Sequence, residues 1–146
     1  MANVSKEEEE IRKLSIEMRL LEQTAESLQQ RISMVNAAMT DLAYANIALE
    51  SIEKEKENAE LLVPIGGSSY IEVKLASSDK VIVGMGAGVS IEKTLPEAKV
   101  IVKERLEELE KAMRSAQQQF GQVAQRINAS RSRVESLLAS VRKGAA

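Results

Sequence analysis

The chain contains no cysteine and no histidine. It therefore forms no disulfide, lacks the thiolate and imidazole ligands of common metal sites, and cannot build a Ser-His or Cys-His nucleophile system. No apolar signal region follows Met1, and no uninterrupted apolar run is long enough to cross a bilayer. We expect a cytoplasmic protein that is not an enzyme and that uses no cofactor and no metal ion.

Aromatic residues are nearly as scarce, because Tyr44, Tyr70 and Phe120 are the only three in the chain. We do not expect a core built on large rings, so Leu, Ile, Val, Met and Ala must supply the packing. Neither sign of charge dominates, since 20 basic and 22 acidic residues are interleaved and leave a net charge of -2. This balance is typical of solvated helix faces and does not favour a nucleic-acid partner.

What the chain does contain is two long series of apolar residues with alternating spacings of three and four. A repeat of 3.5 residues keeps one narrow stripe facing a partner helix, so the pattern predicts a two-helix coiled coil. The two helices have similar lengths and the segment between them can return the chain to the end of the first helix, so we expect the pair to be antiparallel. The first series is Ile11, Leu14, Met18, Leu21, Ala25, Leu28, Ile32, Val35, Met39, Leu42, Asn46 and Leu49. The second series is Val102, Leu106, Leu109, Met113, Ala116, Phe120, Val123, Ile127, Ser130, Val134, Leu137 and Val141.

Local signals bound the first helix. Ser5 with Glu8 has the spacing of a capping box, in which each residue bonds the backbone amide of the other. The heptad rhythm fades after Leu49, and Asn58 is a plausible C-cap because asparagine tolerates the left-handed conformation. The sequence therefore predicts an N-terminal coiled-coil helix over residues 5–58.

The second helix has a similar opening signal. Thr94 with Glu97 forms another capping box, and Pro96 falls in the first turn, where its missing backbone donor costs nothing. The apolar series then continues until Gly144. We predict a C-terminal coiled-coil helix over residues 95–143.

The segment between the helices is rich in β-branched residues and is interrupted by Gly, Pro and Ser-Asp. Gly-rich or Ser-Asp turns separate four short runs, which we interpret as two consecutive β-hairpins over residues 61–93. The predicted strands are 61–65, 70–76, 80–85 and 89–93. The fold class is thus α+β, a single subunit in which two hairpins lie at one end of a long coiled coil.

Two small hairpins are marginally stable alone, and their edges leave backbone donors and acceptors unpaired. We therefore expect the hairpins to join an intersubunit β-barrel. An off-seam stripe on the first helix, Ala37, Tyr44, Ala48 and Ile52, should be buried against this sheet or a neighbouring subunit. The expected oligomerisation residues are Leu61, Val63, Ile65, Ile71, Val73, Leu75, Val81, Val83, Val89 and Ile91.

Three short stretches carry a resemblance to a known family: VPIG at 63–66, VGMGAGV at 83–89, and EKT at 92–94 before the second helix. Together with the order helix, paired hairpins, helix, they make nearly the whole chain similar to the alpha-type prefoldin subunits of archaea. In that family, two hairpins rather than one distinguish the alpha class from the beta class.

The resemblance implies a hexamer of two alpha-type and four beta-type subunits, with six coiled coils extending from a double β-barrel. It implies an ATP-independent holdase that binds unfolded or nascent polypeptides with its coiled-coil tips and delivers them to a group II chaperonin. The C-terminal tail here is short and basic, whereas many relatives end in longer acidic tails. The contact with the chaperonin is therefore not carried over.

Apolar residues near both chain ends are the candidate client-binding surface, because free ends of a helix pair fray. Most of them occupy seam positions, where ordinary coiled-coil packing also explains them. Ile16 and Leu138 fall outside the seam and lack that explanation. The candidate tip residues are Ile11, Leu14, Ile16, Met18, Val134, Leu137, Leu138 and Val141.

Two other functions remain open on the sequence. The chain could be a structural coiled-coil spacer or a filament-forming subunit. It could also grip structured RNA, although only its C-terminal end is basic. A phosphate loop at Gly84, Gly86 and Gly88 is not expected, since the GxGxxG spacing is absent and no helix follows immediately.

Overall fold

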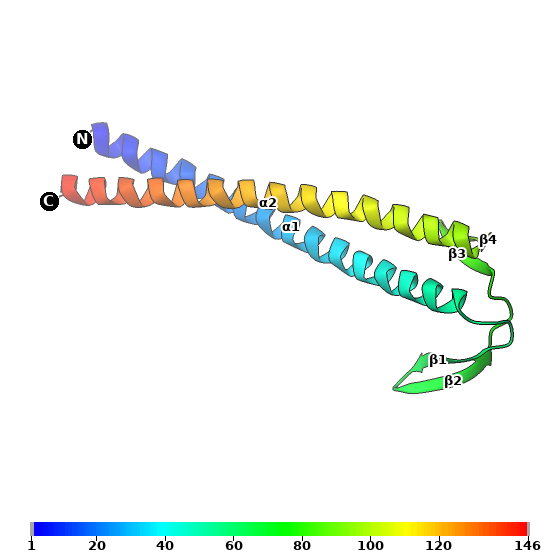
Figure 1. Cartoon of the computed structure of the whole chain (residues 1–146). Coiled ribbons are helices and arrows are strands. Elements are labelled where there is room, and N and C mark those ends of the chain that lie inside the picture. Colours follow the sequence, from blue (N-terminus) through cyan, green and yellow to red (C-terminus); the bar gives the residue numbers. More distant parts are fainter. Residues whose placement is uncertain (1, 146) are drawn as a thin grey trace. The chain divides into compact units, whose positions relative to one another are not determined.

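The computed structural model describes residues 2–145 of the chain, with side chains from residue 6 to residue 144 (Figure 1). Two long helices and two antiparallel hairpins follow one another, which confirms the predicted α+β class. The elements are α1 (Ala2–Glu53), β1 (Glu60–Gly66), β2 (Ser69–Lys74), β3 (Lys80–Gly86), β4 (Val89–Thr94) and α2 (Leu95–Ala145).

The chain divides into two compact units. The terminal unit consists of Met1–Asn36 with Lys111–Ala146, and the hairpin unit consists of Ala37–Glu110. Each unit contains part of both helices, and the hairpin unit also contains all four strands.

In the terminal unit, contacts between the two helices show that they run antiparallel. The Ser140 hydroxyl donates to the Glu7 carboxylate at 3.1 Å, and Arg133 Nε lies 3.1 Å from Glu10 Oε1. Farther along, Arg126 pairs with Glu17 at 2.9 Å. The residue number falls on α2 as it rises on α1, as predicted. The acidic start of α1 thus lies beside Arg133 of α2.

The predicted seam is buried or half-buried throughout both units. Leu21, Leu28, Ala116 and Leu137 are its most enclosed members in the terminal unit, and Leu49 and Val102 are the most enclosed in the hairpin unit. The remaining seam positions are half-buried, including the polar Asn46 and Ser130. A period of 3.5 therefore identified the packed face of each helix correctly.

The predicted ends of α1 were less accurate. The helix begins at Ala2, so Ser5 lies inside it, and the Ser5 side chain is outside the described residues. No Gly or Pro precedes Ser5, and Ala2 is a strong helix former, so nothing interrupts the helix there. α1 ends at Glu53, where the amides of Lys54 and Glu55 bond the carbonyls three residues earlier at 3.3 and 3.0 Å.

Asn58 has the left-handed backbone that was expected, with φ of 71°, but it does not cap α1. Its amide donates to the Leu75 carbonyl at 2.8 Å, which extends the ladder of the first hairpin by one bond. Asn58 thus adopts positive φ in the turn that precedes β1 and not at the end of α1.

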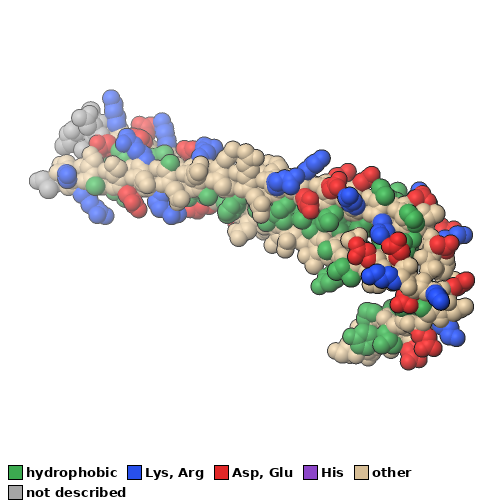
Figure 2. Space-filling model, in the orientation of Figure 1, with side chains coloured by type: hydrophobic (Ala, Val, Ile, Leu, Met, Phe, Trp, Pro, Cys, Tyr) green, Lys and Arg blue, Asp and Glu red, His purple; other side chains and the backbone are tan. Residues whose placement is uncertain are grey.

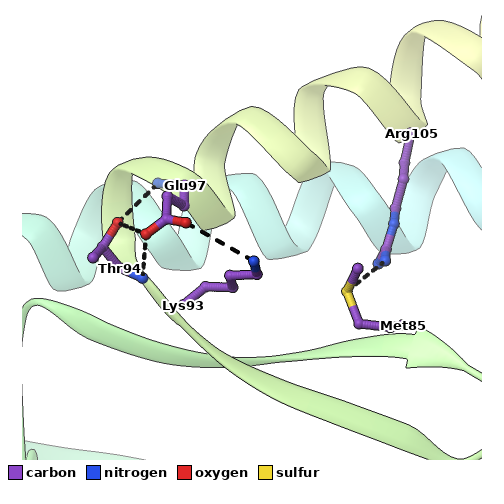
Figure 3. A network of polar contacts seen from close by, with 5 residues as sticks. All are labelled: Met85, Lys93, Thr94, Glu97 and Arg105. Carbon is purple, nitrogen blue, oxygen red and sulfur yellow. Dashed lines mark hydrogen bonds and ion pairs between the residues drawn. The ribbon is translucent and has the colours of Figure 1, made fainter.

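At the start of α2 the predicted capping box is present (Figure 3). The Thr94 hydroxyl donates to Glu97 Oε1 at 2.8 Å, and the Glu97 amide donates to the Thr94 hydroxyl oxygen at 3.3 Å. The Thr94 amide also reaches Glu97 Oε1 at 3.4 Å. These bonds hold the pKa of the Glu97 carboxyl below its ordinary value, and the side-chain bond from Thr94 is the largest cause.

The hairpins form two separate two-stranded sheets, β1 with β2 and β3 with β4. The two hairpins have the same register, and each residue of the second lies twenty positions after the equivalent residue of the first. Glu60 pairs with Lys74 in the first hairpin, for example, and Lys80 pairs with Thr94 in the second. Each has a bulge at the equivalent place, between Pro64 and Gly66 in one hairpin and between the equivalent residues in the other.

Three successive residues of each turn have positive φ. Gly66, Gly67 and Ser68 form the first turn, and Gly86, Ala87 and Gly88 form the second. At Gly86, with φ of 100°, an L side chain would be strained.

The core of the hairpin unit is aliphatic and lies between the helices and the second hairpin. Leu49, Val83, Leu95, Ala98 and Val102 form it. Partly buried residues packed against it are Leu42, Ala45, Ile52, Val81 and Ile101. β3 thus contributes to the core, whereas β1 and β2 contribute nothing to this cluster.

The off-seam stripe of α1 is not covered by the chain's own strands. Ala37 and Ala48 are exposed, and 68% of Tyr44 is exposed. Only Ile52 is partly buried, against the core. Within this single chain the sheet therefore does not bury the whole stripe, because the first hairpin contributes nothing to the core. Burial against a neighbouring subunit, the other arrangement expected for the stripe, stays a prediction.

Candidate functional site

The hairpins present apolar side chains to solvent, and Figure 2 shows those of the first hairpin gathered over β1 and β2. Residues that oppose each other in an antiparallel pair share one face of the sheet. On the first hairpin, the pairs Leu61 with Val73 and Val63 with Ile71 make one face entirely aliphatic. On the second hairpin, Val83 opposes Ile91 on the corresponding face.

The ten expected oligomerisation residues differ widely in exposure. Val83 is buried in the core of the hairpin unit. Leu61, Val73, Leu75 and Val81 are half-buried. The exposed members are Val63, Ile65, Ile71, Val89 and Ile91.

Four further apolar side chains are exposed on the strands and were not among the expected residues. Leu62 and Ile82 are 64% and 75% exposed, and they occupy equivalent positions in the two hairpins. Tyr70 and Met85 are also exposed. Leu62 and Ile82 are twenty residues apart, and each is an apolar residue on the otherwise polar face of its strand. This repeated exception could have identified both residues from the sequence.

A side chain of α2 holds the second hairpin from outside its ladder. One guanidinium nitrogen of Arg105 donates to the Gly84 carbonyl oxygen at 2.7 Å. The same nitrogen lies 3.8 Å from the Met85 sulfur (Figure 3). At the strand end nearer the helix, Lys93 Nζ lies 3.9 Å from the Glu97 carboxylate. These contacts fix β3 and β4 on the first turns of α2.

The expected tip residues separate into two groups in the terminal unit. The seam members Ile11, Leu14, Met18, Val134 and Val141 are half-buried, and Leu137 is buried. The off-seam members Ile16 and Leu138 are 58% and 39% exposed. The structure therefore leaves the off-seam members accessible, whereas the seam members become fully accessible only if the helices separate.

Leu20 is a further exposed apolar residue of this unit, with an exposed fraction of 58%. It lies four residues after Ile16, so both side chains project from the same face of α1. The spacing of four outside the seam could have identified it from the sequence.

Ion pairs flank these apolar residues. Arg133 contacts Glu10, and this hydrogen bond is the main reason that the pKa of Arg133 is raised. Arg126 contacts Glu17, the residue after Ile16. The side chains of both pairs are exposed, so the pairs contribute little to the free energy of unfolding.

Among the described residues, no group of three or more acidic, histidine or cysteine side chains is placed to hold a metal ion. Within the same part of the chain, no helix is both long enough and apolar enough to span a membrane.

Comparisons with known proteins agree with one another. A family model described as "Prefoldin subunit" matches residues 21–140. Prefoldin subunit alpha of Methanococcoides burtonii is 33% identical over 134 residues, which cover 92% of this chain and 89% of the relative. Prefoldin subunit alpha of Methanosarcina barkeri is 37% identical over 109 residues, covering 73% and 76%. The same subunit of Nitrosopumilus maritimus is 32% identical and covers 84% and 93%.

A solved structure shares the fold. The filamentous PFD of Methanocaldococcus jannaschii, determined by cryo-electron microscopy, aligns with a TM-score of 0.64 at 24% sequence identity. The alignment covers 84% of this chain and 95% of that one.

Proposed function

This chain belongs to the prefoldin family, with archaeal alpha subunits among its relatives, and on that premise we propose that it is the alpha-type subunit of an ATP-independent holdase. Prefoldin subunits are non-enzymatic chaperone components that form complexes with other subunits. The expectation that the chain is not an enzyme agrees with this membership.

The proposed assembly uses the hairpins. Five of the expected oligomerisation residues are exposed, and both two-stranded sheets have unpaired edges. A beta-type partner would pair these edges and cover the aliphatic faces. We propose the family arrangement of two alpha-type with four beta-type subunits around a double β-barrel.

The observation that carries client binding is the exposure of Ile16, Leu20 and Leu138 in the terminal unit. These residues lie outside the seam, so coiled-coil packing does not account for them. Exposed aliphatic side chains bind the apolar segments of a non-native polypeptide by removing both from water. Several arms that hold one client raise the effective concentration, so weak single contacts suffice.

The proposal extends to delivery and location. The bound non-native polypeptide would pass to a group II chaperonin in the cytoplasm, as the family resemblance implies. The half-buried seam residues, such as Ile11 and Val141, would join the client surface when the helix ends fray.

The test is light scattering during dilution of a denatured protein without ATP, with the chain assembled with a beta-type partner. We expect the assembly to suppress aggregation and the triple variant Ile16→Ser, Leu20→Ser, Leu138→Ser to lose most of this effect. Met34→Ser is the matched control, because Met34 is 73% exposed on α1 away from the proposed surface. Size-exclusion chromatography verifies that every variant still assembles.

Two outcomes would reject the client-binding surface. A triple variant that suppresses aggregation as well as the wild type would place the surface elsewhere. An intact assembly without any suppression would favour the structural spacer or filament-forming subunit. The filamentous relative gives that alternative its support, and electron microscopy of the assembly distinguishes an open filament from a closed oligomer.

A further inference from the structure

Gly121 lies inside α2 of the terminal unit, although neither of the usual structural reasons for glycine applies there. Its φ is not positive, so the backbone conformation is open to any L residue. A Cβ added at this position would meet nothing within 4 Å, so no neighbouring atom requires the missing side chain. Glycine in a helix interior gives up more conformational freedom on folding than alanine does. Gly121 therefore weakens α2 locally, with no gain in packing.

The segment around Gly121 has no charged side chain to support the helix. Residues 115–125 contain neither acidic nor basic residues, whereas charged residues make up 29% of the whole chain. The ion pairs between positions i and i+4 that stabilise an exposed helix therefore cannot form within this segment. One side-chain hydrogen bond, from Gln119 Nε2 to Ser115 Oγ at 3.2 Å, ends before Gly121. Backbone hydrogen bonds and the seam are left to hold the helix here.

Gly121 also separates two parts of α2 that contact α1 in different ways. Before it, Ala116 is 1% exposed and is the most enclosed seam residue of the terminal unit. After it, exposed polar contacts join the helices, namely Arg126 with Glu17, Arg133 with Glu10, and Ser140 with Glu7. Exposed contacts of this kind contribute little to stability. Separation of the distal part of α2 therefore costs mainly the uncovering of its seam.

The candidate client residues of α2 all lie on the distal side of Gly121. Leu137 is 4% exposed, so a client cannot reach its side chain while the helices are paired. Fraying from the chain end has to extend over several turns before it uncovers Leu137, because α2 continues to Ala145. A bend at Gly121 would uncover the whole distal stripe of α2 in one step, consisting of Val123, Ile127, Val134, Leu137 and Val141.

We propose that Gly121 is the hinge at which the distal part of α2 bends away from α1, and that this bend exposes the distal seam to a client. The client segment that fits is an apolar stretch of a non-native polypeptide, which takes the place of the α1 seam against Leu137 and its neighbours. Gly121 is a positioning residue, because it contacts no client itself. This inference rests on the proposed holdase function and names the part of the arm that opens.

Gly121→Ala tests the hinge without removing any side-chain contact. The difference in helix propensity between glycine and alanine corresponds to an open population about two- to fivefold smaller. We therefore expect that about two- to fivefold more of the assembled variant is needed for the same suppression of aggregation. Asn128→Ala is the matched control, because Asn128 is exposed on α2 beyond the hinge and alanine raises helix propensity there too. Equal effects of the two variants would contradict the hinge.

Spin labels measure the opening itself, since the chain has no cysteine of its own. Glu9→Cys with Ser136→Cys places labels at exposed positions of the two helices beyond the hinge. Gln30→Cys with Gln118→Cys places them at exposed positions before it. In an assembly with a cysteine-free beta-type partner, a denatured client should broaden the distances of the first pair only, as measured by pulsed electron paramagnetic resonance. Gly121→Ala should reduce this broadening.

The hinge and the holdase can fail separately. A wild-type assembly that suppresses aggregation while the distances of both label pairs stay unchanged, or change equally, rejects the hinge alone. An intact assembly without suppression rejects the holdase. Amide hydrogen exchange adds a further criterion, because a hinge predicts a local maximum of exchange at residues 121–125. A smooth rise in exchange toward the C-terminus would show end fraying in place of a hinge.

Discussion

At the scale of single residues, the start of α2 depends on a reciprocal pair of side chains. Thr94 and Glu97 satisfy amides that the first helical turn leaves without an intrahelical partner. This cap also connects β4 to the helix without an intervening loop residue, because β4 ends at Thr94 and α2 begins at Leu95. Changes at the cap therefore affect the hairpin and the helix together.

Thr94→Ala removes the hydroxyl that the Glu97 amide needs. We expect the variant to lower the free energy of unfolding by about 1 kcal/mol, the usual cost of losing an N-cap. Urea unfolding followed by circular dichroism measures it. Thr24→Ala is the control, because the Thr24 hydroxyl bonds the Leu20 carbonyl within α1 and caps nothing. An equal loss in both variants would show that the cap adds no stability.

The cap should also make stability depend on pH. The pKa of Glu97 is lowered in the folded chain, so its contribution is complete above the ordinary glutamate pKa of about 4.3 and is lost as pH falls through the lowered value. Asp79, whose pKa is lowered mainly by the Ser77 hydroxyl, acts in the same direction.

The pH dependence can be assigned by comparing two glutamine variants. Glu97→Gln should reduce the loss of stability between about pH 6 and pH 3, as measured by urea unfolding at each pH. Glu107→Gln is the control, because Glu107 is an exposed residue of α2 that forms no ion pair among the described residues. This variant should leave the pH dependence of stability as it is in the wild type. Identical profiles for Glu97→Gln and the wild type would refute the assignment.

At the scale of elements, the sequence predicted what depends on periodicity and local capping. The heptad series located both seams, and Thr94 with Glu97 located the start of α2. Ser5 wrongly indicated the start of α1, because the spacing of a capping box also occurs within a helix. Asn58 wrongly indicated its end, because a residue with a left-handed backbone occurs in turns as well as at helix ends. Which hairpin reaches the core depends on long-range packing, so Val83 and Val63 look alike in the sequence.

Two glycines show how backbone conformation decides whether a change to alanine stabilises or destabilises the chain. Gly121 lies inside α2, and a Cβ added there would meet nothing within 4 Å, so Gly121→Ala should raise the free energy of unfolding by about 0.5–1 kcal/mol. Gly86 is equally open but has φ of 100°, so Gly86→Ala should destabilise the chain. Thermal unfolding of both variants tests this; a stabilising Gly86→Ala would contradict the strained turn.

At the scale of the whole molecule, apolar packing rather than charge holds the helices together in each unit. The ion pairs are exposed, whereas the seams are aliphatic. Raising the salt concentration to about 0.5 M, which screens exposed pairs, should therefore change the Tm by no more than a few degrees. Differential scanning calorimetry measures it, and a large fall in Tm would show that the ion pairs dominate.

The same salt series addresses the RNA alternative at this scale. Binding to a polyanion weakens steeply with salt through counterion release. With a net charge of -2, we expect no retention of structured RNA even at low salt. Salt-sensitive retention of RNA by the assembled chain would revive that alternative.

The twenty-residue spacing of the hairpins makes this region a removable cassette. Excision of residues 59–78 would join Asn58 to Asp79, which occupies in the second hairpin the position of Ala59 in the first. The shortened chain would keep the complete β3–β4 ladder and the bond from the Leu95 amide to the Asp79 carbonyl. The shortened chain would have the one-hairpin layout that distinguishes the beta class in this family. A single in-frame deletion would thus convert the two-hairpin architecture into the one-hairpin architecture, and both helices lie outside the excised residues.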